Sequence, residues 1–370
     1  MEALPKPPVL GNSMIVPSVQ ELASKSLVKV PPQYIQMLDH QDPPFIINEV
    51  LTVTSALPII DLQTLLSHPE TNNNNFDSEL VKLHSACKKW GFFQLVNHGV
   101  NTSLLDKVKS EIESFFKLPM EEKKKYWQDE ENFEGFGQAF VFSEEQKLDW
   151  ADMFYMITLP RQARKHHLFP KLPGALRDAL ESYTSELQNI AMKLVEFIGR
   201  ALEIETKVMN EFFKDGLQTM RMNYYPPCPQ PELVMGLASH SDAIGISILF
   251  QLNEIEGLQI KNEGIWIPVK PLPNTFVVNL GDILEILTNG LYRSVEHRVT
   301  VNSMKERLSV ATFYSPKLEE VIGPLPCLIN PHNPALFKTV GVEEYFKKRY
   351  SLKLNGKLTI DFMRIEGDTA

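Results

Sequence analysis

A series of short apolar strands separated by turns fills the second half of the chain and limits most strongly what it can fold into. From Ile244 to Phe250, large apolar residues stand at every second position, the pattern of a strand that buries one face. Similar segments follow, interrupted by glycine and proline, at 258–260, 266–269, 275–280, 298–301 and 308–313. Many short strands at this spacing predict a double-sheet jelly roll or a related barrel.

The first half of the chain predicts elements that pack around this β core. Its strongest helix signal is an apolar stripe with steps of three and four residues between Leu176 and Phe197. The stripe stops before Gly199, which favours a single helix lying along a sheet over a coiled coil. Apolar segments at 56–62 and 90–96 predict two further strands, and a short helix is expected around 342–350.

The expected fold class is therefore α+β: a distorted double-stranded β-helix (jelly roll) core with flanking helices and an N-terminal helical and β extension. Residues 1–55 are rich in proline and form a lead-in segment that should wrap over the surface. Residues 56–215 form an N-terminal region that packs on the core. Residues 216–320 form the jelly roll itself, and residues 321–370 form a C-terminal segment with a short helix.

Composition narrows the classes of partner and the compartment. Among 370 residues, 37 Lys and Arg stand against 46 Asp and Glu, a formal charge of -9 that argues against nucleic acid. No apolar run approaches the roughly 20 residues that span a bilayer, and the N-terminus lacks the pattern of a secretory signal. Three scattered cysteines predict buried, reduced thiols. We expect a cytoplasmic monomer that binds neither nucleic acid nor membrane.

Two histidines and an aspartate form a candidate metal centre. His240 and Asp242 stand two positions apart, so on a strand both side chains leave the same face. His297 lies on another predicted strand, which a jelly roll would bring opposite them at its mouth. Two imidazoles and one carboxylate can hold iron(II) and leave three coordination positions open. A zinc hydrolase could use the same ligands, so the triad alone leaves both readings open.

A guanidinium and a hydroxyl follow the triad on the last predicted strand. Arg307 and Ser309 together suit the free carboxylate of a dicarboxylic acid, because the planar guanidinium fork binds a carboxylate through two nitrogens. A simple zinc hydrolase gives no reason for this pair. The combination favours an oxygen-activating iron enzyme that consumes a keto acid.

Six segments resemble the plant 2-oxoglutarate- and iron(II)-dependent dioxygenases in order and spacing. They are Asn223–Pro231, Gly236–Asp242, Glu256–Ile260, Asn279–Asp282, Ser294–Arg298 and Glu306–Ser309. Trp90–Gly99 resembles the N-terminal signature of that family, and the resemblance extends over residues 57–316. It implies Fe(II) as the metal and 2-oxoglutarate and O2 as cosubstrates, with ascorbate as a supporting reductant.

The resemblance also implies roles for individual residues. The positions of the iron ligands are occupied by His240, Asp242 and His297, and no catalytic group beyond the metal centre is implied. The positions that hold 2-oxoglutarate are occupied by Arg307, Ser309, Tyr225 and Asn223. The chain departs from the family at Ser241, where many members have threonine, and at residues 243–247, where a Leu-Thr pair is commoner. The second departure leaves the substrate preference open.

Met153, Tyr155, Arg221 and Phe313 match family positions that face the substrate. Aromatic and thioether side chains suit a flat, partly apolar molecule, and a role in the core remains the alternative for each. Residues 133–138 and 147–152 resemble the branch that contains alkaloid O-demethylases (codeine and thebaine type) and senescence-related oxygenases. This branch implies hydroxylation or oxidative O-demethylation of a plant aromatic specialised metabolite, with a methoxylated alkaloid favoured as the small-molecule substrate.

Other functions stay open from the sequence. Within the family, the alternatives are an oxidase of a flavonoid, another phenolic compound or a hormone, and an oxygenase that omits 2-oxoglutarate. Outside it, a metal-dependent hydrolase would work with zinc and without oxygen or keto acid. A catalytically silent small-molecule receptor is the remaining class, which the intact triad and the Arg307–Ser309 pair oppose.

Overall fold

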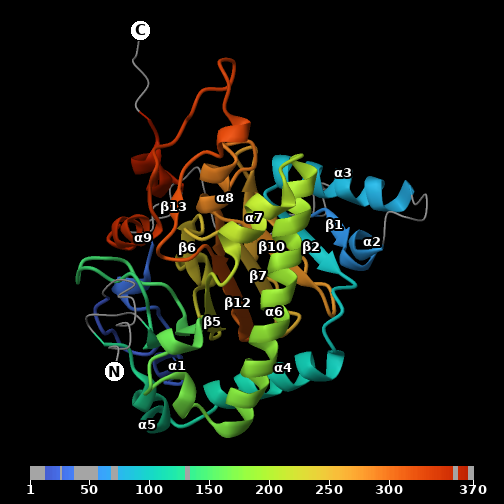
Figure 1. Ribbon diagram of the computed structural model, residues 1–370. Helices are drawn as coiled ribbons and strands as arrows, with labels where there is room; N and C mark the ends of the chain where they lie inside the picture. Colours follow the sequence, from blue (N-terminus) through green and yellow to red (C-terminus); the bar gives the residue numbers. More distant parts are fainter. Residues whose placement is uncertain are drawn as a thin grey trace, which may run out of the picture.

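The computed structural model describes residues 13–25, 27–36, 57–67, 74–129, 134–352 and 357–365. Most of the expected lead-in segment, residues 1–55, therefore lies outside the described residues. Its described part contains a short α-helix, α1 (Val19–Ala23), and a short 3-10 helix at Pro32–Tyr34. Two β-sheets form the centre of the molecule and helices pack around them, as Figure 1 shows.

The larger sheet has eight strands and joins the N-terminal region to the core. Its order is β1 (Ile59–Asp61), β2 (Phe92–Val96), β10 (Phe276–Leu280), β7 (Ile246–Gln251), β12 (Arg307–Ser315), β5 (Leu217–Tyr225), β4 (Asp152–Leu159) and β3 (Gly135–Gly137). Strands from the N-terminal region therefore occupy both edges of this sheet. Three of the four central strands, β10, β7 and β12, match segments that were predicted as strands. The fourth, β5, lies within residues 216–320, the predicted jelly roll, but was not predicted as a strand.

The smaller sheet has four strands, all from the predicted jelly roll. Its order is β6 (Leu237–His240), β11 (His297–Val299), β8 (Leu258–Asn262) and β9 (Ile265–Pro268). A separate two-stranded sheet joins β13 (Val321–Ile322) to β14 (Val340–Gly341) in the C-terminal segment. The predicted jelly-roll core with flanking helices is confirmed.

The helices follow the amphipathic patterns of the sequence. Their bounds are α2 (Leu62–Leu66), α3 (Asn74–Lys89), α4 (Thr102–Phe116), α5 (Met120–Lys123), α6 (Gly174–Ala201), α7 (Thr206–Phe213), α8 (Asp282–Leu287) and α9 (Val342–Tyr350). The longest, α6, buries its apolar stripe against β4, β7 and β12 and also packs on α3, α4 and α7 (Figure 1). It is a single helix along a sheet, as predicted.

The structure also bears on membrane-spanning helices and on the burial of the cysteines. Among the described helices, none combines the length and apolar character that crossing a bilayer requires. All three cysteines are free thiols. Cys87 and Cys228 are buried as expected, but Cys327 is exposed, so the expectation that all three are buried is wrong.

The buried carboxylate of Asp152 connects α1 to the beginning of β4 through hydrogen bonds. Asp152 is fully buried and accepts hydrogen bonds from the Ser18 hydroxyl at 2.6 Å and from the backbone N–H groups of Val19 and Gln20 at 2.9 and 2.8 Å. These donors belong to the first turn of α1, where backbone N–H groups lack partners within the helix. The N-terminal segment is thereby tied to the first residue of β4.

We predict that Asp152→Ala lowers the free energy of unfolding by about 3 kcal/mol, because it leaves a hydroxyl and two backbone N–H groups without acceptors. Chemical denaturation measures the change. The matched control is Asp178→Ala, which removes an exposed carboxylate that contacts Arg177 at 3.5 Å and should change stability by less than about 0.5 kcal/mol. Equal stability of the two variants would contradict this role for Asp152.

Candidate metal centre and cosubstrate pocket

The pairing of β6 with β11 brings two histidines face to face. His240 and His297 are direct partners across this antiparallel pair, and their ring centroids lie 4.3 Å apart. Phe92 from β2 packs edge-on against His297, with ring centroids 5.3 Å apart. The prediction placed these histidines on opposite strands of a jelly-roll mouth; they lie on neighbouring strands of one sheet.

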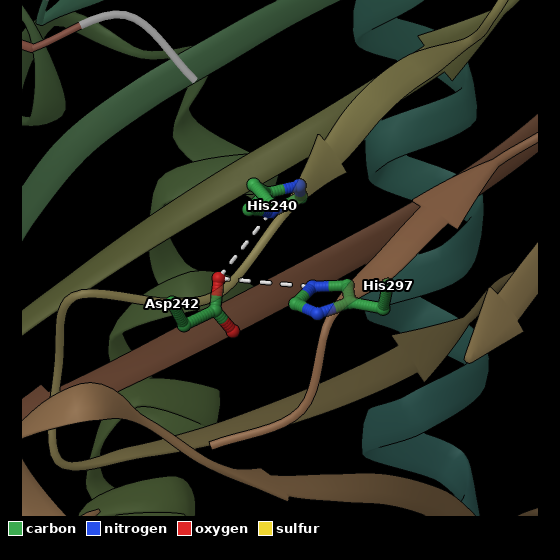
Figure 2. Close-up of side chains that lie close together, drawn as sticks. All are labelled: His240, Asp242 and His297. Carbon is green, nitrogen blue, oxygen red and sulfur yellow. Dashed lines mark ion pairs between the residues drawn. The ribbon is translucent and has the colours of Figure 1, made fainter. Parts of the chain in front are cut away.

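Asp242 completes the group from a turn rather than from a strand. Strand β6 ends at His240, so the prediction that both side chains leave one face of the same strand is wrong. The chain leaves β6 after His240 and bends at residues 243–245, and the Asp242 carboxylate points toward the two imidazoles (Figure 2). The Asp242 Oδ1 atom lies 3.5 Å from His240 Nε2 and 3.8 Å from His297 Nε2.

The chemistry of these three groups fits a metal ion. All three residues are buried, and one ligand atom from each lies within 4.8 Å of the others. This is the one group of three or more histidine, cysteine or acidic residues with such spacing among the residues that the structure describes. A set of two imidazoles and one carboxylate that leaves positions open is typical of non-haem iron(II) oxygenases.

Backbone carbonyls fix the orientation of both imidazoles. The Nδ1 atom of His240 lies 2.8 Å from the Ala238 carbonyl oxygen, and that of His297 lies 3.1 Å from the Val295 carbonyl oxygen. Since a carbonyl only accepts, each Nδ1 is the protonated donor and each Nε2 presents a lone pair toward Asp242. This is the tautomer that a metal-binding histidine needs.

Two donors hold the other oxygen of the carboxylate. The Ser247 hydroxyl donates to Asp242 Oδ2 at 2.7 Å, and the Asn279 side-chain amide donates to the same atom at 2.8 Å. Oδ1 is thereby left facing the imidazoles. The residues come from β7 and β10, adjacent strands of the larger sheet, so the carboxylate bridges the two sheets.

The local electrostatics favour the cation-binding forms of His297 and Asp242. Burial, and then the neighbouring His240, lower the pKa of His297 to about 4, so this imidazole is neutral near pH 7. Burial alone would raise the pKa of Asp242. The two histidines and the Asn279 hydrogen bond outweigh that effect and hold it well below the usual range. A neutral imidazole beside an ionised carboxylate is what cation binding requires.

The candidate cosubstrate residues face each other on β12 and β5. Arg307 is the direct partner of Tyr225, and Ser309 is the direct partner of Asn223. The Arg307 guanidinium stands over the Tyr225 ring at 5.2 Å, and the Ser309 hydroxyl is within 3.4 Å of both the Arg307 and the Asn223 nitrogens. Strand pairing thus brings together the four residues implied by the resemblance.

The Arg307 guanidinium is buried without a carboxylate partner. It is only 2% exposed, it forms none of the ion pairs found among the described residues, and its Nε atom has no hydrogen-bond partner. Its Nη2 atom donates to Gln251 Oε1 at 3.0 Å, a contact that the sequence had not indicated. A buried cation without a counter-charge is costly. The arrangement therefore fits an anionic ligand such as the carboxylate of 2-oxoglutarate.

Glycine at position 257 leaves room for this guanidinium. A Cβ atom built there would lie 2.7 Å from the Thr300 carbonyl oxygen and 2.9 Å from Arg307 Cδ. Neither contact is tolerated at that distance, and the first atom belongs to the backbone. The Glu256–Ile260 segment that supported the resemblance thus includes a packing requirement of the Arg307 site.

One cavity joins the candidate metal ligands, the cosubstrate residues and the expected substrate residues. It has about 1020 Å³ of space, part of it in the open mouth. Alternate residues of three adjacent strands line it, because side chains on one face of a sheet recur at every second position. They are Met153 and Tyr155 of β4, Arg221, Asn223 and Tyr225 of β5, and Arg307, Ser309, Ala311 and Phe313 of β12.

Several lining residues were not anticipated. Phe140 comes from the segment between β3 and β4, and Arg349 and Tyr350 come from the end of α9. No periodic pattern in the sequence points to them, because they reach the cavity from separate parts of the chain. Asn279 did belong to a segment noted for its resemblance, but without a role.

Comparison with known proteins agrees with this geometry. Residues 216–316 match the 2OG-Fe(II) oxygenase superfamily, and residues 57–172 match the family described as non-haem dioxygenase in morphine synthesis N-terminal. Codeine O-demethylase of Papaver somniferum is 55% identical over 96% of this chain and 98% of that protein. Oxoglutarate-dependent flavonoid 7-O-demethylase 1 of Ocimum basilicum is 52% identical over 96% of this chain and 93% of that protein.

A solved structure shows the same fold with its cofactors. The crystal structure of JOX2 in complex with 2OG, Fe and JA superposes with a TM-score of 0.85 at 33% identity, covering 95% of this chain and 98% of JOX2. The matches extend from the N-terminal region through the jelly roll. The chain belongs to the 2-oxoglutarate- and iron(II)-dependent oxygenase superfamily.

Proposed function

We propose that His240, Asp242 and His297 bind the Fe(II) ion of this oxygenase and that Arg307 and Ser309 hold the distal carboxylate of 2-oxoglutarate. The observation that supports this assignment best is the buried Arg307 guanidinium, which has no acidic partner among the described residues and lines the same cavity as the triad. Asn223 and Tyr225 complete the cosubstrate site from the neighbouring strand.

Iron and 2-oxoglutarate held by these residues would supply the oxidising chemistry: with O2, the keto acid would become succinate and CO2, and the second oxygen atom would enter a substrate C–H bond. The residues of this chain supply position and polarity. Arg307 and Ser309 orient the keto acid, and Ser247 and Asn279 hold the ligand carboxylate. The apolar wall around Met153 and Phe313 keeps the substrate close and excludes water.

We propose oxidative O-demethylation of an aromatic plant metabolite as the reaction. Insertion of oxygen into an O-methyl C–H bond gives a hemiacetal, which breaks its C–O bond to release formaldehyde and leave a free hydroxyl. Phe140, Phe313 and Tyr350 give the cavity the aromatic surface that suits a flat ring system. The similarity to codeine O-demethylase favours a methoxylated alkaloid.

A methoxylated flavonoid is the second candidate, and one feature of the cavity favours it. Arg221 lines the cavity, and its buried Nε atom has no hydrogen-bond partner, so a donor is available for a carbonyl or phenolic oxygen. Among the lining residues, Asp242 is the one carboxylate, and the metal would occupy it. A protonated amine would therefore lack a counter-charge in this wall.

We also propose that the protein acts as a cytoplasmic monomer. The free cysteines support a reducing compartment, and the formal charge of -9 suits neither nucleic acid nor an anionic membrane surface. Analytical ultracentrifugation tests the oligomeric state.

The purified protein, supplied with Fe(II), ascorbate and 2-oxoglutarate, should convert a methoxylated alkaloid or flavone into the product that lacks one methyl group. Formaldehyde and succinate should appear in equal amounts, because one keto acid is consumed for each methyl group lost. Mass spectrometry and formaldehyde trapping measure the products. Hydroxylated products that retain every methyl group would contradict demethylation while leaving the oxygenase intact.

Two controls separate this reaction from hydrolysis. Asp242→Ala should abolish turnover, since one of three proposed ligands is lost, and zinc in place of iron should also abolish it. Demethylation that persists with zinc, or without 2-oxoglutarate and oxygen, would identify the site as a hydrolase instead.

Replacing Arg307 by lysine should raise the KM for 2-oxoglutarate by about tenfold or more, because an ammonium group cannot form the two parallel hydrogen bonds of a guanidinium. Steady-state kinetics with varied 2-oxoglutarate measure the effect. Arg298→Lys is a useful control, because Arg298 is also buried but lies on β11 next to Gln259. An unchanged KM in Arg307→Lys would remove this residue from the cosubstrate site.

Ser247→Ala should weaken Fe(II) binding by about tenfold, because one of the two donors to Asp242 Oδ2 is lost and the carboxylate can rotate. Anaerobic titration calorimetry measures the dissociation constant. Thr312→Val serves as the control, since Thr312 lies on β12, is buried, and is not among the residues that line the cavity. Equal Fe(II) affinity in both variants would show that the Ser247 hydrogen bond does not position the ligand.

A further inference from the structure

Helix α9 contacts the turn that presents the proposed metal ligands. Arg349, near the end of α9, is 2% exposed and donates from Nη2 to the Ser241 carbonyl oxygen at 2.9 Å. Ser241 stands between His240 and Asp242 in the chain. A side chain from the C-terminal segment therefore hydrogen-bonds the backbone that joins two proposed ligands.

Asp282 at the beginning of α8 holds the same turn from the other side. Its backbone N–H donates to the Asp242 carbonyl oxygen at 2.7 Å, and its Oδ2 atom accepts from the Ser241 hydroxyl at 3.2 Å. The Arg349 Nε atom lies 3.8 Å from Asp282 Oδ2. Arg349 and Asp282 thus form a buried ion pair whose two members both bind the turn.

Position 281, just before Asp282, is glycine because the start of α8 lies very close to the backbone at Ile244. A Cβ atom at position 281 would lie 2.0 Å from the Ile244 carbonyl oxygen, a separation that no side chain can adopt. The beginning of α8 is thereby pressed against the segment that leaves the ligand turn. The turn has little freedom to move without α8 and Arg349.

The residue after Arg349 forms part of the substrate wall. Tyr350 lines the cavity, stacks on Phe140 with ring centroids 5.7 Å apart, and stacks on Phe346 at 5.4 Å with an interplanar angle of 3°. Phe140 also lines the cavity. Two consecutive residues of α9 therefore contact the metal-ligand turn and the expected substrate space.

We propose that Arg349 is a positioning residue that couples the substrate wall at Tyr350 to the geometry of the metal ligands. A shift of Tyr350 moves the end of α9, and the Arg349–Asp282 pair transmits that shift to the turn at Ser241. The inference rests on the proposed assignment of His240, Asp242 and His297 as the iron ligands.

A double-mutant cycle on metal affinity tests this coupling without knowledge of the substrate. Arg349→Met, Tyr350→Ala and the double variant are titrated with Fe(II) under anaerobic conditions in the presence of 2-oxoglutarate. The dissociation constant and the visible charge-transfer absorption of the complex are both recorded. Lys347→Met is the control on the same helix, because Lys347 is exposed and forms an ion pair with the exposed Glu343 at 2.8 Å.

We expect Arg349→Met to weaken Fe(II) binding by about tenfold, the usual loss of affinity when a residue that hydrogen-bonds a metal ligand is removed. The absorption band should also shift. Tyr350→Ala should have a smaller effect that disappears in the Arg349→Met background, because the connection is already broken. Lys347→Met should match the wild type. Unchanged affinity and absorption in Arg349→Met, or strictly additive effects of the two substitutions, would overturn the coupling.

Two further variants, Arg349→Lys and Asp242→Ala, distinguish a misfolded Arg349→Met protein, a wrong metal site and an absent coupling. If Arg349→Met does not fold, Arg349→Lys replaces it; its single ammonium group cannot contact both Asp282 and the Ser241 carbonyl, so a smaller loss of affinity is expected. Wild-type affinity and absorption in Arg349→Lys would then overturn the proposal. If Asp242→Ala binds Fe(II) as tightly as the wild type, the proposed metal site is wrong. If Asp242→Ala loses binding while Arg349→Met is unchanged, the site stands and the coupling alone fails.

Discussion

The pairing of His240 with His297 across β6 and β11 is the constraint on which the site depends. Strand register fixes the separation of the two imidazoles, and a backbone carbonyl fixes the tautomer of each. The third group, Asp242, obtains its position from outside this sheet, through hydrogen bonds from Ser247 and Asn279 of the larger sheet. The candidate metal centre is therefore also a junction between the two sheets, and their packing determines its geometry.

The cavity beside this junction contains one negative group, Asp242, and a buried positive group, Arg307. The carboxylate of Asp242 faces the proposed metal position, and the guanidinium of Arg307 lies in the same cavity without a carboxylate partner in the described part of the chain. A dicarboxylic keto acid satisfies both, because one end can bind the cation at the metal position and the other end can pair with the guanidinium. The remaining wall is largely aromatic and aliphatic, so one surface of the cavity orders the cosubstrate and the other accepts an apolar ring system.

The sequence predicted the parts of the structure that local patterns encode. The stripe of α6, the bounds of α9 and the alternation in β7 all follow from periodic burial, and the chemistry of the triad and of Arg307 follows from residue types. The turn at Asp242 was mistaken for strand, because a two-residue spacing looks the same in both. Arg349, Tyr350 and Gln251 could not be foreseen, since their roles arise from contacts between segments that only tertiary packing brings together.

A crystal structure of the protein with Mn(II) and 2-oxoglutarate, grown without oxygen, would locate both ligands. We expect one ion bound by His240 Nε2, His297 Nε2 and Asp242 Oδ1, with the ketone and one carboxylate of 2-oxoglutarate completing its coordination. The distal carboxylate should accept hydrogen bonds from Arg307 and Ser309. An ion bound elsewhere, or a keto acid whose distal carboxylate lies away from Arg307, would show that these residues do not form the metal and cosubstrate site.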